Sequence, residues 1–579
     1  MAAGGGVQSA SLTGTPRWAV RIRGADGEIA GAGILLSPDR VLTCAHVVDR
    51  AADRITAEFV GAADHSVPAV PARVEGDAYV PETQDADGDP SGDVALLRLE
   101  WPRPAEETVR LHRLSAPDRE VRMYGFPYDH NGGIWFRATV VGGCGRDGQV
   151  QLSPTNPGEL AGPGCSGAGV ADRETGEVIG MVLSGQRDQH GNRFSFMSPA
   201  ETIARHLPRL KPYIVGPPAV DDRLRSTRGD ASPDLLDEPF AQRLAAWLRN
   251  DGSRVKISVV RHDDAARDAT LLRAIALADR ELRTPVSVDR ASLDPPGTVP
   301  SAGGHDLAVH AGGLTSAEVA RRIAERMGLW QHPDDPPLDR IRTAKATLDL
   351  VVVGVDEAVD PLALLDLLDV LRAGGSRLLL VFRTAGDCHR RAVERLVTRP
   401  ALERRTRLVA RLKEITGPLA GALHERRAAV LPDGVRPLDS DLVAAHAALA
   451  DLLRAQDRDP GHGPDPARYE RLADRVTDRL RTSVGRLDRL RDRRDELTGR
   501  LRSYHVLHQH TTQGEEDPAV DALYLRAHDL LRARPCDVRA AESAVEAYTR
   551  RVDDHVQGGA RDDAENAGAA GRRDGEPPV

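Results

Sequence analysis

Residues 31–48 read GAGILLSPDRVLTCAHVV, two apolar runs that are separated by a Ser-Pro-Asp turn and followed by a histidine, His46. Short runs rich in Val, Ile and Leu and bounded by turn residues are typical of β-strands. Similar runs recur from Trp18 to about Ile214, with breakers such as Gly191-Asn192 between them. Evenly spaced short strands predict an all-β barrel or sandwich for this part of the chain.

Three polar side chains stand out in this β-rich segment. His46 follows a strand, Asp93 precedes the apolar run 94–97, and Ser166 lies between glycines in the loop 162–169. Each feature alone is typical of ordinary structure, because packed histidines, acids at strand starts and Gly-rich turns are common. A carboxylate before a buried run is costly, however, unless it meets a hydrogen-bond donor.

Taken together, the three residue types suit nucleophilic catalysis. A serine hydroxyl needs a base within hydrogen-bond reach, and that base needs an orienting carboxylate. Glycines beside the serine let backbone N–H groups converge on a developing oxyanion. The order His, Asp, Ser within one β-rich segment is the order of the chymotrypsin-type triad.

Residues 17–214 resemble the trypsin-like, chymotrypsin-fold serine peptidases, particularly their bacterial intracellular and Deg-type branch. The resemblance is carried by the stretch 31–48, by GDVALLRL at 92–99, and by GPGCSGAGV at 162–170 followed by GEVIGMVLSG at 176–185. It implies an all-β double barrel with the cleft between the barrels. It also implies hydrolysis of peptide bonds in protein substrates.

The same resemblance implies roles for single residues. His46 is expected to be the general base, Asp93 its orienting partner and Ser166 the nucleophile. The amides of Gly164 and Ser166 are expected to form the oxyanion hole.

A substrate pocket follows from the resemblance as well. Its base is expected at Leu160 and its walls at Leu183 and Gly185, with Ser195 opposite. Since no acid stands at the base, we expect a small or medium apolar substrate side chain rather than Arg or Lys.

Cys165 marks a departure from the family pattern. Members that are activated by proteolysis carry an aspartate immediately before the nucleophile, which pairs with the newly freed N-terminal amine. Here that position is Cys165, so we expect no zymogen cleavage of that type. Two interpretations of Cys165 and Cys44 stay open: a place close to the site, or the favoured one, small buried apolar side chains.

Composition changes after residue 214, and the changes predict further domains. Residues 1–16 are expected to be a flexible N-terminus, and 215–235, rich in Pro, Gly and charges, a linker. Residues 236–400 alternate apolar strands with helical patterns, and the strand Leu350–Val355 is a continuous apolar run. This pattern predicts a parallel α/β layer that is buried on both faces.

Part of the α/β region resembles an inactive signalling P-loop ATPase of the STAND type. LDLVVVGVDE at 348–357 and SRLLLVFRT at 376–384 are similar to its Walker-B strand and next strand, where Asp356 or Glu357 would hold magnesium or a water. Lysine occurs at four positions and never follows a glycine, so the chain has no GxxxxGK[ST] phosphate loop. We expect no ATP binding. The region is either a scaffold or sensor derived from such a module, or a plain α/β domain.

Helical patterns dominate residues 401–555. Between 466 and 505 apolar side chains recur every three or four residues, which predicts a long helix. Segments 517–531 and 537–555 are its expected antiparallel partners in a bundle. A self-associating coiled coil is the alternative. Residues 556–579 are expected to be disordered.

Composition excludes several classes of protein. The chain has 579 residues and a net charge of −9, which argues against a protein that coats nucleic acid. No run of about 18 apolar residues is present, and no secretory signal is visible, so neither a membrane span nor export is expected. Five scattered cysteines without a CxxC pair fit a reducing cytoplasm and predict neither structural zinc nor another metal.

We therefore expect a multidomain cytoplasmic serine endopeptidase that needs no cofactor. Its C-terminal domains would regulate it or recruit a regulatory or sensor protein, as in effectors of bacterial conflict and antiviral defence systems, which share this arrangement. A second hypothesis is a scaffold in which an inactive peptidase domain serves for docking. A third hypothesis is a Deg-like quality-control protease. This hypothesis is weakened because no PDZ-like module is expected after the peptidase.

Overall fold

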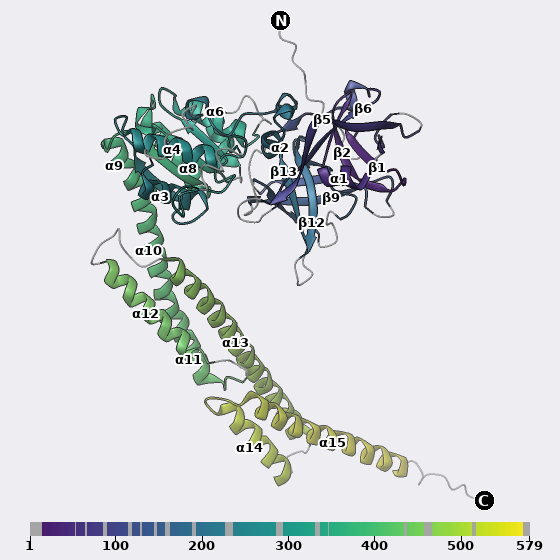
Figure 1. Ribbon diagram of the computed structural model, residues 1–579. Coiled ribbons are helices and arrows are strands. Elements are labelled where there is room, and N and C mark those ends of the chain that lie inside the picture. The colour runs from purple at the N-terminus through teal and green to yellow at the C-terminus, as the bar shows by residue number, and fades with distance from the viewer. Residues whose placement is uncertain are drawn as a thin grey trace, which may run out of the picture. The chain divides into compact units, whose positions relative to one another are not determined.

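The computed structural model describes most of the chain: residues 14–51, 54–63, 66–84, 90–113, 118–127, 130–143, 148–156, 162–187, 193–225, 236–284, 293–329, 336–344, 347–433, 437–456, 466–511 and 517–570. The chain divides into two compact units, residues 1–397 and 398–579 (Figure 1). Within the described ranges, every helix is too short or too polar to cross a lipid bilayer.

The first unit begins with a closed six-stranded antiparallel barrel. In barrel order its strands are β1 (Ala19–Arg23), β2 (Ile29–Ser37), β3 (Arg40–Thr43), β6 (Pro90–Leu99), β5 (Ala69–Gln84) and β4 (Ile55–Glu58). Its interior is filled by fully buried Val, Ile and Leu side chains, among them Ile22, Ile34 and Leu96. The Ser-Pro-Asp turn lies between β2 and β3, as its sequence predicts.

A second barrel of six strands follows. Its order is β11 (Gly169–Asp172), β8 (Glu120–Gly125), β9 (Ile134–Gly143), β10 (Val150–Pro154), β13 (Arg193–Pro199) and β12 (Val178–Arg187), and β12 pairs with β11 to close the ring. The short strands β7 (Leu111–His112) and β14 (Ile214–Val215) extend the sheet beyond β12. The predicted double barrel is therefore confirmed.

The segment that follows the barrels differs from the linker expected at 215–235. Helix α2 (Ala200–His206) follows β13, and β14 then leads to Val220, which pairs with Ala308. The Asp221 carboxylate binds the Arg322 guanidinium at 2.7 Å. Because Val220 and Leu224 are buried, residues 215–225 are packed against the α/β domain despite their Pro and Gly content. Residues 226–235 lie outside the described part.

The α/β domain contains a four-stranded parallel sheet. Its order is β15 (Val255–Val259), β18 (Arg377–Phe382), β17 (Asp349–Val353) and β16 (Leu307–His310). Val352 points to a cluster with α6 (Ser316–Arg326) and α8 (Pro361–Ala373), while Val351 and Val353 point to α3 (Glu238–Leu248) and α4 (Ala265–Ala278). Burial on both faces explains the continuous apolar run, and the predicted α/β layer is confirmed.

The second unit is a bundle of long helices. They are α10 (Arg399–Glu414), α11 (Ala420–Ala429), α12 (Asp439–Gln456), α13 (Pro466–Thr511), α14 (Pro518–Arg532) and α15 (Val538–Ala570). The apolar stripe of α13, including Leu480, Leu487 and Leu497, is buried against the other helices of the unit, as predicted for a bundle. Helix α15 continues to Ala570, beyond the boundary at residue 556 expected for a disordered tail.

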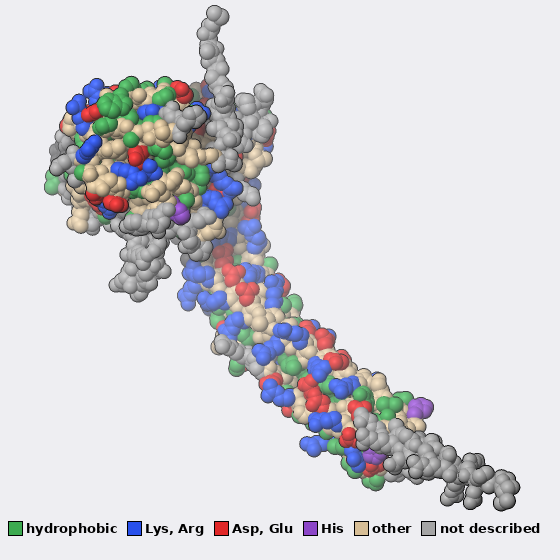
Figure 2. All heavy atoms as spheres, turned by 90° about the vertical axis from the view of Figure 1, so that its right-hand side faces the viewer, with side chains coloured by type: hydrophobic (Ala, Val, Ile, Leu, Met, Phe, Trp, Pro, Cys, Tyr) green, Lys and Arg blue, Asp and Glu red, His purple; other side chains and the backbone are tan. Residues whose placement is uncertain are grey.

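Charged side chains cover the outside of this helical unit. Figure 2 shows arginines interspersed with aspartates and glutamates along its length. Several of them join neighbouring helices, such as Arg404 with Glu470 on α13 and Arg426 with Asp488. Exposed pairs of this kind contribute little individually, about 0–1 kcal/mol each.

Candidate active site

His46 lies at the start of a short helix, α1 (Ala45–Ala51), immediately after β3. The strand end is fixed because the buried Thr43 hydroxyl donates a hydrogen bond to the Ala32 carbonyl at 2.7 Å. The His46 side chain keeps about a fifth of its surface exposed (21%), so one edge of the ring remains accessible.

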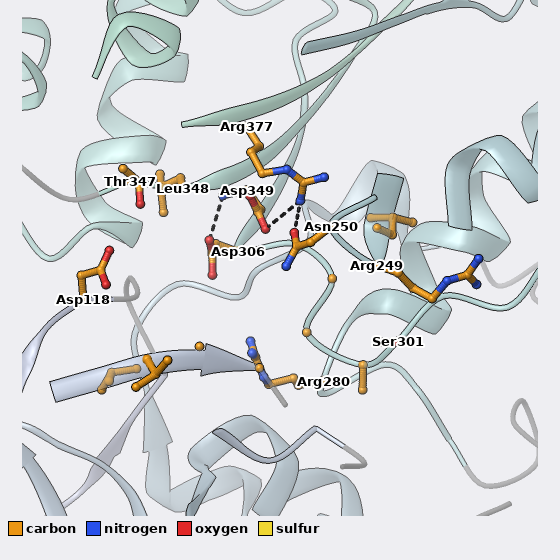
Figure 3. A pocket seen from close by; sticks show the side chains of 18 of the residues that line it. Asp118, Arg249, Asn250, Arg280, Ser301, Asp306, Thr347, Leu348, Asp349 and Arg377 are labelled. Carbon is orange, nitrogen blue, oxygen red and sulfur yellow. Dashed lines mark hydrogen bonds and ion pairs between the residues drawn. The ribbon is translucent and has the colours of Figure 1, made fainter. Parts of the chain in front are cut away.

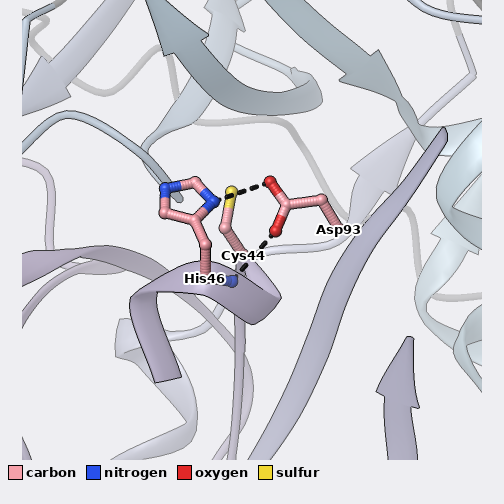
Figure 4. Close-up of side chains that lie close together, drawn as sticks. All are labelled: Cys44, His46 and Asp93. Carbon is pink, nitrogen blue, oxygen red and sulfur yellow. Dashed lines mark hydrogen bonds and ion pairs between the residues drawn. The ribbon is translucent and has the colours of Figure 1, made fainter. Parts of the chain in front are cut away.

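Asp93 reaches His46 from the neighbouring strand, β6. Its Oδ2 lies 2.8 Å from His46 Nδ1, and its Oδ1 accepts the His46 backbone N–H at 3.0 Å (Figure 4). The backbone of Asp93 is left-handed, with φ of 64°, and it follows Gly92 with φ of 84°. Such a conformation is unfavourable for most non-glycine residues and is tolerated best by Asn and Asp. Asp93 nevertheless lies inside β6, and its carboxylate there meets the imidazole.

Two opposing effects act on the Asp93 carboxyl. Burial alone would raise its pKa, but the hydrogen bonds and charge of His46 outweigh burial and lower the pKa below the ordinary value. The carboxylate is therefore ionised near neutral pH. Since it accepts a hydrogen bond from Nδ1, the imidazole proton lies there and Nε2 is left as the basic nitrogen.

Cys44 belongs to the same cluster, so it is both buried and close to the site. Its sulfur, a nitrogen of His46 and an oxygen of Asp93 all lie within 4.8 Å of one another. Figure 4 draws these three side chains. Three such atoms are a potential set of metal ligands, but burial and the nearby Asp93 charge raise the pKa of the Cys44 thiol well above its usual value. The thiol is therefore protonated and donates to the Val182 carbonyl at 3.3 Å. This state suits a hydrogen-bonded neighbour of the His46–Asp93 pair better than a metal ligand.

Glycines shape the loop that carries Ser166. Gly164 has φ of 91° and Gly167 has φ of 87°. A Cβ on Gly164 would collide with the Phe126 carbonyl oxygen, and one on Gly167 would collide with that of Ala32. The loop therefore requires glycine at both positions. The Ser166 carbonyl accepts the Ala32 N–H at 2.8 Å, which joins the loop to β2, the strand that pairs with β3 before His46.

The amides of this loop alternate between bonded and free. Those of Cys165 and Gly167 donate to the carbonyls of Gly162 and Val182. Those of Gly164 and Ser166 have no acceptor within the described ranges. The free pair is the pair predicted from the sequence for an oxyanion hole.

Ser166 itself is buried, with 5% of its surface exposed. Its hydroxyl forms no hydrogen bond with His46 or with another described residue. The His46 and Asp93 side chains are thus joined by a direct hydrogen bond. Ser166 is joined only through its backbone carbonyl to β2, the strand that pairs with β3.

The residues expected around the substrate pocket lie mainly on β12 and β13. Leu183 and Ser195 are buried, and Gly185 pairs with Ser195 across the two strands. The buried Ser195 hydroxyl has no hydrogen-bond partner among the described residues. Leu160 falls outside the described residues. Cys165 is buried, and burial raises the pKa of its thiol to about 12, in keeping with the expected inert side chain.

The two acids that resemble Walker-B residues are engaged in internal bonds. Asp356 accepts hydrogen bonds from the Arg383 and Thr384 amides, each at 2.8 Å. Glu357 lies 2.6 Å from His262 Nε2. Both carboxylates therefore connect neighbouring loops at the carboxyl edge of the sheet.

Two closed antiparallel barrels with a His–Asp pair and a glycine-rich serine loop define the chymotrypsin-like fold. The N-terminal region is a trypsin-like peptidase domain, since residues 31–181 match the family model of that description. No curated protein matches the chain.

Some solved structures of proteases are similar to about a third of this chain. One is the MamO protease domain of Magnetospirillum magneticum, with 15% identity, coverage of 33% of this chain and 96% of that chain, and a TM-score of 0.25. Another is mouse neuropsin, a serine protease, with 16% identity, coverage of 34% of this chain and 94% of that chain, and a TM-score of 0.27. A third is a serine endoprotease from Yersinia pestis (16% identity, 34% of this chain and 63% of that chain, TM-score 0.26).

Proposed function

We propose that the chain is a serine endopeptidase in which Ser166 is the nucleophile, His46 the general base and Asp93 its orienting partner. The observation that carries the proposal is the His46–Asp93 bond of 2.8 Å, because it leaves Nε2 as the basic nitrogen of a partly exposed ring. The free amides of Gly164 and Ser166 support it further.

The proposed reaction uses these groups in two halves. Ser166 Oγ attacks the carbonyl carbon of the scissile peptide bond while its proton passes to His46 Nε2, and the oxyanion accepts hydrogen bonds from the two free amides. The ionised Asp93 stabilises the imidazolium. His46 then gives the proton to the leaving amine, and an acyl-enzyme remains. Water, deprotonated by His46, hydrolyses this ester and restores Ser166.

For specificity we propose a small or medium apolar side chain next to the scissile bond. Leu183, Gly185, Ser195 and Leu160 would form the pocket, and none of them carries a charge that would pair with Arg or Lys. Cleavage of a peptide library, read by mass spectrometry, tests this: cuts mainly after Arg or Lys would contradict it.

Hydrolysis of an unfolded protein substrate tests the activity itself. Ser166→Ala should lose activity, while Ser153→Ala, at an exposed position on β10 of the same domain, should retain it. Equal activity of both variants would assign the hydrolysis to a contaminant or to another site.

We further propose that the α/β domain and the helical unit regulate the peptidase or recruit a sensor protein, as in a cytoplasmic effector of bacterial defence. The absence of a His46–Ser166 hydrogen bond in the described residues supports a resting site that is completed when substrate or a partner binds. The same observation favours the second candidate, a scaffold with an inactive docking domain. Assays with and without the products of neighbouring genes separate them, since activity that appears only with a partner excludes the scaffold.

A further inference from the structure

A cavity of about 580 Å³ lies within the first unit, between the peptidase and α/β domains. It is lined by Val140–Gly143 at the end of β9 and by residues at the amino ends of the parallel strands. Asp349 and Arg377 are two of the latter (Figure 3). Ligands of parallel sheets usually bind at the carboxyl ends, and there Asp356 and Glu357 are occupied by internal bonds. The size of the cavity is that of a typical small-molecule site.

Arg280 is the feature that points to a ligand. Its side chain extends into the cavity, yet only 6% of the residue is exposed. Its guanidinium forms no hydrogen bond or ion pair with a described residue, and its Nε is buried without an acceptor. Gly303 leaves the space that the guanidinium occupies, because a Cβ there would collide with it. The Nε is therefore desolvated, while the rest of the guanidinium faces the cavity, where an anion would supply the missing acceptors.

Four acids line the cavity: Asp118 and Asp251 are exposed to solvent, and Asp306 and Asp349 have partners elsewhere. Asp306 Oδ2 accepts the Asp349 N–H at 2.8 Å, and Asp349 Oδ2 lies 3.3 Å from Arg377 Nη1. Asp306 and Asp349 act on Arg280 only through space, since neither is within ion-pair distance of it, and burial raises the pKa of both, that of Asp349 to about 6. Their remaining oxygens can accept hydrogen bonds from hydroxyl or amino groups.

The cavity also connects to the peptidase through buried polar contacts. The Arg326 guanidinium donates to the Asp306 carbonyl at 2.8 Å and pairs with Glu201 at 3.0 Å, and both side chains are almost fully buried. Glu201 lies on α2, which directly follows β13 and its residue Ser195. A ligand that moves Asp306 would therefore act on the strand that carries part of the expected substrate pocket.

We propose that this cavity is a regulatory site for a small organic anion, a phosphate or carboxylate that also carries hydroxyl or amino groups. The anionic group binds Arg280, and the donor groups bind Asp306 and Asp349. The regulatory part rests on the proposed peptidase function, whereas the binding part does not.

Binding is tested by calorimetry and thermal unfolding of the full chain with four probes: inorganic phosphate, a sugar phosphate, a nucleoside monophosphate and citrate. We expect at least one probe to bind and to raise the midpoint of unfolding by about 2 °C or more at saturation. Arg280→Gln should weaken that binding by about tenfold or more, while Arg243→Gln, at an exposed position on α3, should not.

The unliganded variant separates a binding role of Arg280 from a structural one. If Arg280 serves a ligand, Arg280→Gln unfolds at the same temperature as the parent or higher, because an uncompensated buried charge is removed. A lower midpoint, binding that persists in Arg280→Gln, or no binding of any probe would overturn the proposal.

Regulation is read from the rate at which a fluorophosphonate labels Ser166. The bound probe should change that rate in the parent and not in Arg280→Gln. Binding without any change in rate would overturn the regulatory part. If Ser166 is never labelled, the proposed peptidase function fails, and the calorimetric result still decides whether the site exists.

Discussion

Asp93 is the residue on which the site depends most. Its left-handed backbone is unfavourable, and its burial disfavours ionisation, yet two hydrogen bonds from His46 keep it charged. The sequence predicts the pairing of Asp93 with His46 only through resemblance to a family. The left-handed backbone of Asp93 was not predictable, because it forms where β6 pairs with strands distant in the sequence, such as β3 about 50 residues earlier.

Asp93→Asn should abolish most of the activity while keeping the fold. Asparagine tolerates the left-handed backbone, but it cannot stabilise an imidazolium and favours the wrong tautomer of His46. In the general Ser-His-Asp template this change lowers kcat about 10⁴-fold, and a loss of about 10³-fold or more is expected here. Steady-state hydrolysis measures it, with Asp77→Asn, an exposed acid of the same barrel, as the control. Activity within about tenfold of the parent would contradict the role of Asp93.

The pKa of Asp93 predicts how stability depends on pH. Because the folded-state pKa lies below the ordinary value of 3.8, the carboxylate contributes stability above that pH, and this contribution is lost as pH falls through the folded-state pKa. The difference in free energy of unfolding between parent and Asp93→Asn should therefore be largest near neutral pH and shrink below about pH 4. Urea unfolding across this range measures it. A difference that grows on acidification would mean that the pKa is raised.

At the scale of elements, the spacing of apolar residues predicted strands and helices correctly, whereas the Pro and Gly content of the connecting segments was a poorer guide to their packing. The strand Asp349–Val353 and the long helix Pro466–Thr511 follow from a continuous run and from a repeat of three to four residues. The packing of residues 215–225 was not predictable, because Pro and Gly indicate a break whether or not Val220 later pairs with Ala308. The burial of Arg280 was not predictable from the sequence either, because it depends on the space that Gly303 leaves for the guanidinium.

The serine loop should tolerate alanine at one glycine and not at another. Gly164→Ala places a Cβ at φ of 91° against the Phe126 carbonyl, and we expect a loss of about 1–3 kcal/mol of stability together with most of the activity. Gly162→Ala meets no atom within 4 Å and should be nearly neutral. Thermal unfolding and hydrolysis of both variants check this. Equal effects at the two positions would argue against a loop whose conformation requires glycine at position 164.

The apolar stripe of α13 predicts the energetics of the helical bundle. Leu487 is fully buried, so Leu487→Ala should cost about 2–5 kcal/mol. Val506, about half exposed on the same helix, should change stability little when replaced by alanine. Circular dichroism during urea unfolding measures both. If Leu487→Ala changed the oligomeric state instead of the stability, the stripe would belong to a coiled coil between chains.

At the scale of the whole molecule, the chain combines a peptidase domain with an α/β domain and a helical unit that carry no part of the expected triad. Within the first unit, the buried Arg326–Glu201 pair joins the α/β domain to α2 of the peptidase. Such a pair is costly to break, because removing one partner leaves a buried charge alone. This contact connects the α/β domain to α2, as the proposed regulation requires.

Intact-mass analysis after treatment with an organophosphonate is the most direct test of the central claim. We predict one adduct per chain, on Ser166, that is absent in Ser166→Ala and strongly slowed in Asp93→Asn. An adduct on a different serine, or none with or without partner proteins and small anions, would contradict a catalytic role for the His46–Asp93 pair and Ser166.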